Sequence, residues 1–108
     1  KTGTDLPSLA DLLKLDDTDF RQFFAGTPVR RAGYERFLRN VLIAAGNSGE
    51  AGLMPLVTPF LDHSSALLRA MAIWALRQLV DDNIWQELRE ACLPDERDQS
   101  VRREWKNN

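Results

Sequence analysis

LRNVLIAA, from Leu38 to Ala45, and LRAMAIWA, from Leu68 to Ala75, are two versions of one pattern, thirty residues apart in a chain of 108 residues. A shorter version, VRREW, follows about thirty-three residues later, from Val101 to Trp105. Each version falls on the second helix of a predicted helix pair. A period of about 30 residues with two helices per unit is typical of an α-solenoid, in which neighbouring pairs bury each other's apolar faces.

Apolar residues recur at helical spacing along the whole chain, and no stretch alternates as a strand does. The predicted helices are a short one with Leu6 to Leu13, a short one with Phe20 to Phe24, a third from Ala32 or Gly33 to about Gly46, a fourth with Leu53 to Leu61, a fifth over about 65–80, a sixth with Ile84 to Cys92, and a last with Val101 and Trp105. We therefore predict an all-α fold of HEAT-like repeats with about 6–7 helices. It forms one domain over 1–108, with two short helices and an Arg-rich loop in 1–31 and the repeats in 32–108.

Several local signals refine this prediction. The fifth helix is apolar nearly all round, which is typical of a helix buried on both sides, and a serine just before it is its expected N-cap. Pro59 lies inside the fourth helix and is expected to kink it. The acid pairs Asp16-Asp17, Asp81-Asp82 and Asp95-Glu96 stand where helices begin, so we expect them to cap those helices.

The composition describes an ordinary globular chain, with 44% hydrophobic residues, 28% charged residues and a formal net charge of −2. No apolar run approaches the roughly 20 residues that span a bilayer, so we expect no membrane contact. The one cysteine, Cys92, forms no internal disulfide and fits a reducing compartment, the cytoplasm. Its apolar spacing predicts a packed thiol.

No catalytic constellation is visible in the sequence. His63 is the only histidine, which excludes metal sites built from several imidazoles. It lies in a predicted turn, either as a solvated residue or with a role in binding. No metal site is predicted in this chain.

Positive charge is concentrated between Phe20 and Gly49. That stretch holds one acid, Glu35, and five basic residues, all of them arginines: Arg21, Arg30, Arg31, Arg36 and Arg39. Guanidinium groups bind phosphate in bidentate fashion, and the free N–H groups at a helix start favour an anion. A polyanionic partner is one interpretation of this region. The other is a solvated face whose arginines pair with acids on neighbouring helices.

Three further residues of this stretch are candidates for ligand contacts, and two of them also have a structural interpretation. Tyr34 either packs in the core or stacks on a base. Asn40 is positioned to hydrogen-bond a ligand. Asn47 either does the same or ends the helix in the left-handed conformation.

The run FRQFFAGTPVRRAGYERFLRNVLIAAGNSG, from Phe20 to Gly49, closely resembles the C-terminal part of the tRNA epoxyqueuosine reductases. The opening LPSLADLL, from Leu6 to Leu13, and the helix ending Ile73 to Leu76 resemble them too. The similarity covers nearly the whole chain. Its most specific elements are GTPVRR, FLRN and GNSG, in that order.

The resemblance implies a place within a longer enzyme that reduces epoxyqueuosine to queuosine at the tRNA wobble position. Such enzymes use cobalamin and two [4Fe–4S] clusters, held in cobalamin-binding and ferredoxin-like domains upstream of the HEAT-like module. One cysteine holds no such cluster, so the resemblance implies no cofactor and no catalysis in this chain. It implies a tRNA-facing, structural module. The nucleic-acid-binding residues we expect are Arg30, Arg31, Arg36, Arg39, Asn40 and Asn47. The alternative is a HEAT-like protein–protein interaction module without RNA contact.

Overall fold

The computed structural model describes residues 8–15, 18 and 31–106, and all regular structure in those ranges is helical. The α-helices are α1 (Leu9–Leu13), α3 (Arg31–Ser48), α4 (Met54–Val57), α5 (Ala66–Leu79), α6 (Asp82–Cys92) and α7 (Gln99–Lys106). Short 3-10 helices form η1 (Ala51–Leu53), η2 (Thr58–Asp62) and η3 (Leu93–Asp95). The all-α prediction is confirmed for this part of the chain. The helix expected with Phe20 to Phe24, and the cap expected at Asp16-Asp17, lie outside the described residues.

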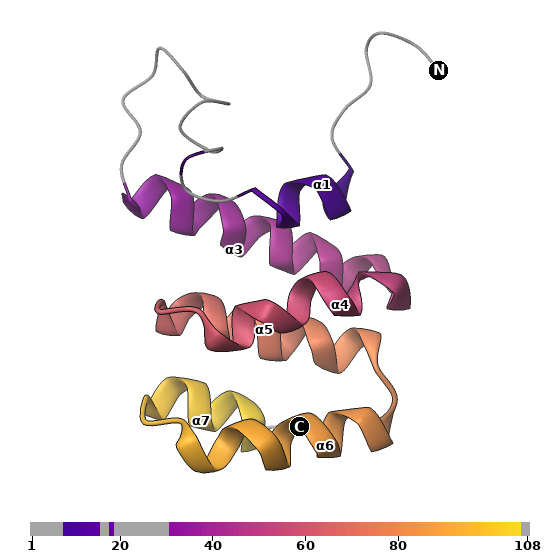
Figure 1. Ribbon diagram of the computed structural model, residues 1–108, viewed down its shortest axis with the longest axis vertical. Coiled ribbons are helices and arrows are strands. Elements are labelled where there is room, and N and C mark those ends of the chain that lie inside the picture. Colours follow the sequence, from indigo (N-terminus) through magenta and orange to yellow (C-terminus); the bar gives the residue numbers. More distant parts are fainter. Residues whose placement is uncertain (1–7, 16–17, 19–30, 107–108) are drawn as a thin grey trace, which may run out of the picture.

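The helices are stacked in tiers, with α1 and α3 at one end, α4 and α5 in the middle, and α6 and α7 at the other end (Figure 1). Helix α5 contacts α3 on one side and α7 on the other. The three sequence patterns begin with a residue that is 0% exposed in each case: Leu38, Leu68 and Val101. A helix between two neighbours needs apolar residues on both sides, so the predicted double burial of α5 is confirmed.

Helix α3 is longer than the spacing predicted, since it begins at Arg31 and ends at Ser48. Gly49 follows with a φ of +68°, and it is the described residue with a left-handed backbone. The prediction that Asn47 ends the helix in that conformation is therefore wrong. Glycine has no Cβ to oppose a positive φ, and Ser48 secures the turn because its Oγ donates to the Ala45 carbonyl oxygen at 2.6 Å.

The middle tier shows the expected break at Pro59. Helix α4 ends at Val57, and the chain continues as the 3-10 helix η2 with Pro59 near its start. A proline nitrogen has no hydrogen to donate to the preceding turn. Helix α5 then begins after Ser65, whose side chain accepts a hydrogen bond from the Leu68 N–H at 3.3 Å, so the predicted serine N-cap is confirmed.

The last tier corrects one predicted cap. Asp81 caps α6 as expected, because its Oδ1 accepts from the Ile84 N–H at 2.9 Å. The cap of α7 is Asp98, whose Oδ1 accepts from the N–H groups of Ser100 and Val101. The prediction for Asp95-Glu96 is wrong because a 3-10 turn and an extended segment intervene before the helix starts.

Candidate nucleic-acid interface

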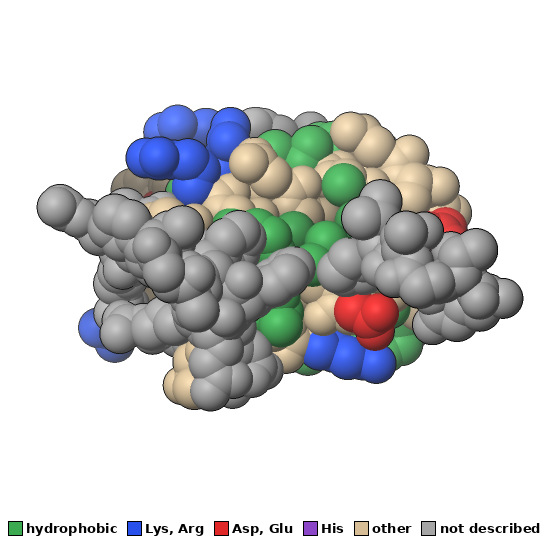
Figure 2. All heavy atoms as spheres, turned by 90° about the horizontal axis from the view of Figure 1, so that it is seen from above, with side chains coloured by type: hydrophobic (Ala, Val, Ile, Leu, Met, Phe, Trp, Pro, Cys, Tyr) green, Lys and Arg blue, Asp and Glu red, His purple; other side chains and the backbone are tan. Residues whose placement is uncertain are grey.

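One face of α3 carries four of the six residues that the sequence predicted to bind nucleic acid. Arg36, Asn40 and Asn47 are spaced by four and seven residues, and Arg39 stands beside them, so all four share one side of the helix. Their side chains are exposed, whereas Leu38 on the opposite side is fully buried. Figure 2 views the molecule from the α1 and α3 end and shows a cluster of basic side chains at one edge, with smaller groups of basic side chains elsewhere on that side.

The remaining two predicted residues stand at the start of this helix. Arg30 lies outside the described residues. Arg31 is the first residue of α3, and its side chain is not described. The role of both arginines therefore stays a prediction.

A hollow of about 270 Å³ lies between the start of α3 and the start of α5. It is lined by Glu35, Arg36, Arg39 and Leu67. Leu67 is 44% exposed and is the large hydrophobic residue that stands out as exposed in the described part of the chain. Sequence reasoning missed Leu67, because it counted this leucine among the apolar residues of a helix buried all round. The lining of this hollow therefore combines two cations, one carboxylate and an uncovered leucine.

The arginines of this face are not engaged by acids within residues 31–106. Arg39 donates from Nη1 to Asn40 Oδ1 at 3.4 Å. Neither Arg36 nor Arg39 comes within ion-pair distance of a described carboxylate. The interpretation that they pair with acids on neighbouring helices therefore finds no support in this range.

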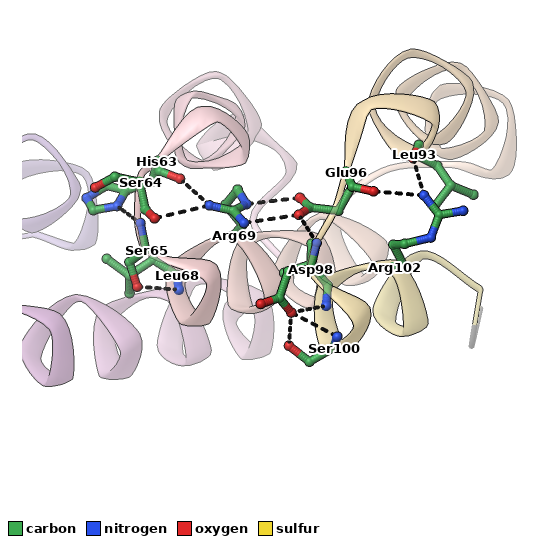
Figure 3. Close-up of polar contacts among 11 residues, drawn as sticks. His63, Ser64, Ser65, Leu68, Arg69, Leu93, Glu96, Asp98, Ser100 and Arg102 are labelled. Carbon is green, nitrogen blue, oxygen red and sulfur yellow. Dashed lines mark hydrogen bonds and ion pairs between the residues drawn. The ribbon is translucent and has the colours of Figure 1, made fainter.

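Arg69, the matching arginine of the second pattern, is engaged inside the protein. Its Nε and Nη2 donate to the two carboxylate oxygens of Glu96 at 2.9 and 3.0 Å (Figure 3). Its Nη1 donates to the carbonyl oxygens of His63 and Ser64 at 2.8 and 3.2 Å. Burial of Glu96 opposes ionisation, but the hydrogen bonds from Arg69 and from the Asp98 N–H, with the charge of Arg69, outweigh it and lower the pKa of Glu96.

Arg102, in the third pattern, makes the same kind of contact. Its Nη1 donates to the carbonyl oxygens of Leu93 and Glu96 at 3.0 and 2.8 Å (Figure 3). Both Arg69 and Arg102 are the fourth residue of their helix, so each reaches back to the carbonyls of the loop before it. These two arginines stabilise the connections within the fold.

Arg39 follows Leu38 as Arg69 follows Leu68, yet its surroundings differ. Arg39 is the ninth residue of α3, because this helix begins more than a turn earlier relative to the pattern. The residues before it are therefore helical, and their carbonyls accept hydrogen bonds within the helix. Arg39 is left exposed on the surface of α3.

His63 is part of the loop that Arg69 secures. Its Nδ1 accepts from the Ser65 N–H at 2.9 Å, and its ring stacks on Phe60 at 5.9 Å between centroids. His63 is half-buried, and these contacts hold it within the loop. His63 and Cys92 both line a hollow of about 460 Å³ between the last two tiers.

Cys92 packs against the core, as predicted. Burial, followed by the nearby carboxylates of Asp62, Asp95 and Glu96, raises the pKa of its thiol. A thiol held in its neutral form is a poor nucleophile and a poor metal ligand.

Tyr34 is also accounted for by packing. It is half-buried against the core, and its hydroxyl donates to the Leu15 carbonyl oxygen at 3.0 Å, which joins α3 to the end of α1. Of its two interpretations, core packing is the one that this contact supports.

The described ranges hold no group of three or more His, Cys, Asp or Glu side chains that could bind a metal ion. They also contain no helix with the length and apolar character needed to cross a membrane.

Comparison with known proteins identifies the relatives. An epoxyqueuosine reductase of Alicycliphilus denitrificans is 40% identical over 78 residues, which make up 65% of this chain and 22% of that protein. The epoxyqueuosine reductase of Xanthomonas campestris is 35% identical over 79 residues, 72% of this chain and 22% of that protein. The chain is related to the epoxyqueuosine reductases. The resemblance predicted from the sequence is confirmed.

A third epoxyqueuosine reductase, from Pseudomonas aeruginosa, is 36% identical over 81 residues, 68% of this chain and 21% of that protein. The chain spans only about a fifth of the length of these reductases. No protein-family model matches the chain, and neither does any solved structure.

Proposed function

We propose that this chain is the C-terminal, HEAT-like module of an epoxyqueuosine reductase and helps to hold the anticodon stem–loop of a tRNA. The module is not catalytic by itself. Cobalamin and the two [4Fe–4S] clusters belong to upstream cobalamin-binding and ferredoxin-like domains of the parent enzyme, which acts in the cytoplasm. Cys92, as the one thiol of the chain, does not fit the four-thiolate ligand set of such a cluster.

The observation that carries this proposal is the contrast between the arginines. Arg69 and Arg102 are used inside the fold. Arg36 and Arg39 are exposed, have no carboxylate partner among the described residues, and stand on a rigid helix beside exposed amides. Cations without a carboxylate partner in the described part of the chain are suited to bind the phosphates of a polyanion.

The equivalent contacts in successive tiers support the HEAT-like part of the proposal. Leu68 and Val101 are fully buried at the same place in consecutive helix pairs. The arginine after each of them secures the preceding loop. In a solenoid, each repeat contacts only its neighbours through such recurring positions.

The test is binding of a labelled anticodon stem–loop to the chain and its variants at low salt. Arg36→Gln/Arg39→Gln is expected to bind about ten-fold more weakly or worse, since each lost charge-assisted contact costs about 1.5–3 kcal/mol. Arg30→Ala/Arg31→Ala is expected to weaken binding as well. The matched control is Lys14→Gln/Arg97→Gln, which removes the same charge from exposed residues that line other hollows.

Equal affinity of the wild type and the arginine variants contradicts the proposal, and so does an equal loss in the control. A complex with the upstream domains that is insensitive to salt, together with no RNA binding, supports the rival function. In that case the arginine face docks onto an acidic protein surface.

A further inference from the structure

The surface of α3 continues onto the neighbouring helix α5. The residues of α5 that are spaced like the α3 face are Leu67, Ala70, Met71, Trp74 and Gln78. At one end, Leu67 joins Arg36 and Arg39 around the same hollow. Further along, Gly46 of α3 lies directly against Trp74 of α5. The two faces therefore form one surface that runs along both helices.

Trp74 differs from the other two tryptophans of the chain. Trp85 and Trp105 are 3% and 1% exposed and lie 4.9 Å apart between ring centroids in the last tier. Trp74 keeps part of its side chain at the surface. Within the described residues its indole N–H has no hydrogen-bond partner, and this atom is not among the buried ones. An aromatic ring that is partly open to solvent and has an unused donor can accept a ligand.

The ring of Trp74 is held in place by close packing. A Cβ added to Gly46 would stand 2.5 Å from Cζ3 of the indole, so the glycine provides the space in which the ring rests. Side-chain amides flank this place: Asn47 follows Gly46, and Gln78 donates from Nε2 to the Trp74 carbonyl oxygen at 3.3 Å. Both amide side chains are exposed. A fixed aromatic ring next to amides suits a planar ligand with hydrogen-bonding edges.

We propose that Trp74 stacks on an unpaired nucleobase of the RNA whose phosphates Arg36 and Arg39 contact. This inference rests on the proposed function. Aromatic side chains beside a positively charged groove are the usual means of binding unpaired bases. Trp74 lies seven residues from Leu67, about 10 Å along α5, so one short stretch of RNA can reach both the arginines and the ring.

Two probes test this inference: an anticodon stem–loop, whose loop bases are unpaired, and a fully paired RNA duplex with the same number of phosphates. Trp74→Leu keeps an apolar side chain against Gly46 but has no aromatic face, whereas Trp74→Phe keeps one. Base stacking on an aromatic residue is worth about 1–3 kcal/mol. We therefore expect Trp74→Leu to bind the stem–loop about five-fold more weakly or worse. Its duplex binding should be unchanged, and Trp74→Phe should restore most of the stem–loop affinity.

Tryptophan fluorescence gives an independent readout, because the other two tryptophans are buried. The stem–loop should quench the tryptophan fluorescence of the wild type and leave that of Trp74→Leu unquenched.

Unchanged stem–loop affinity in Trp74→Leu, or an equal loss of affinity for the stem–loop and the duplex, overturns the inference. If stem–loop binding still depends on Arg36 and Arg39 in that case, the proposed function is retained and only the role of Trp74 is rejected. If the wild type binds no RNA at low salt, both the proposed function and the role of Trp74 are rejected.

Discussion

Gly46 shows how a single residue sets the distance between two helices. A methyl group at this position would meet the Trp74 ring at 2.5 Å and the Ala75 Cα at 3.1 Å. The second contact is with backbone, which cannot turn aside as a side chain can. Gly46→Ala should therefore lower the free energy of unfolding by about 1–3 kcal/mol, as overpacking does, measured by urea denaturation.

Gly33→Ala is the matched control for this prediction, because it makes the same change in the same helix. No heavy atom lies within 4 Å of a Cβ added at Gly33. Alanine favours a helix over glycine by about 0.5–1 kcal/mol, so this variant should be as stable as the wild type or more so. Equal destabilisation by both substitutions would show that α3 and α5 do not pack through Gly46.

The Arg69–Glu96 ion pair predicts a pH dependence of stability. The pKa of Glu96 is lowered in the folded state, so its ionised form stabilises the fold. That contribution is fully present above the ordinary value of 4.5 and is lost as the pH falls through the lowered pKa. The difference in unfolding free energy between the wild type and Glu96→Gln should shrink below about pH 4.5. A difference that stays constant from pH 7 to pH 3 contradicts this.

At the residue scale, the sequence predicted which residues pack in the core, but it did not predict which arginine is bound inside the fold and which is exposed. The leucine–arginine pairs at 38–39 and 68–69 look the same in sequence. The fold secures one arginine and exposes the other, because α3 and α5 begin at different distances from the pattern. Leu67 was missed for a similar reason, since helical spacing alone does not tell which side of an apolar helix lacks a neighbour.

At the scale of elements, the caps decide where the helices begin. Asp98 Oδ1 accepts from two N–H groups of α7, whereas Asp95 is exposed in η3. Asp98→Ala should lower thermal stability and the helical signal in circular dichroism, because it leaves those N–H groups without their partner. Asp95→Ala should leave both nearly unchanged. The reverse order would show that the cap predicted from the sequence was correct.

Substitutions at core positions of α3 and α5 test which faces of these helices are buried. Leu42 and Leu68 are each 0% exposed. Leu42→Ala and Leu68→Ala should each cost about 2–5 kcal/mol of unfolding free energy, because each leaves a cavity. A change under about half a kcal/mol at both sites, typical of surface positions, would show that the assigned faces are wrong.

Helices with strong spacing could be predicted from the sequence, while their boundaries could not. Repeated apolar positions identified α3, α5 and α6, and Pro59 marked the break after α4. The end of α3 was missed, because Gly49 and not Asn47 takes the left-handed conformation. The start of α7 was missed, because two acidic candidates precede Asp98 and sequence alone does not rank them.

At the scale of the whole molecule, the tiers place α3, α5 and α7 in one continuous layer. The exposed sides of α3 and α5 form one surface in which arginines, amides and Trp74 meet. In the later tiers, Arg69 and Arg102 stabilise the connections between helices. A chain with a net charge of −2 thus carries exposed arginines close together on one side of α3.

The most direct test of this account is the salt dependence of anticodon stem–loop binding. If about four phosphates are neutralised, the logarithm of the affinity should fall with the logarithm of the salt concentration at a slope of roughly −3. Arg36→Gln/Arg39→Gln should flatten that slope by roughly 1.5, while the Lys14→Gln/Arg97→Gln control keeps the wild-type value. A slope near zero for the wild type, or the same slope in all three proteins, would contradict the claim that this arginine face binds RNA.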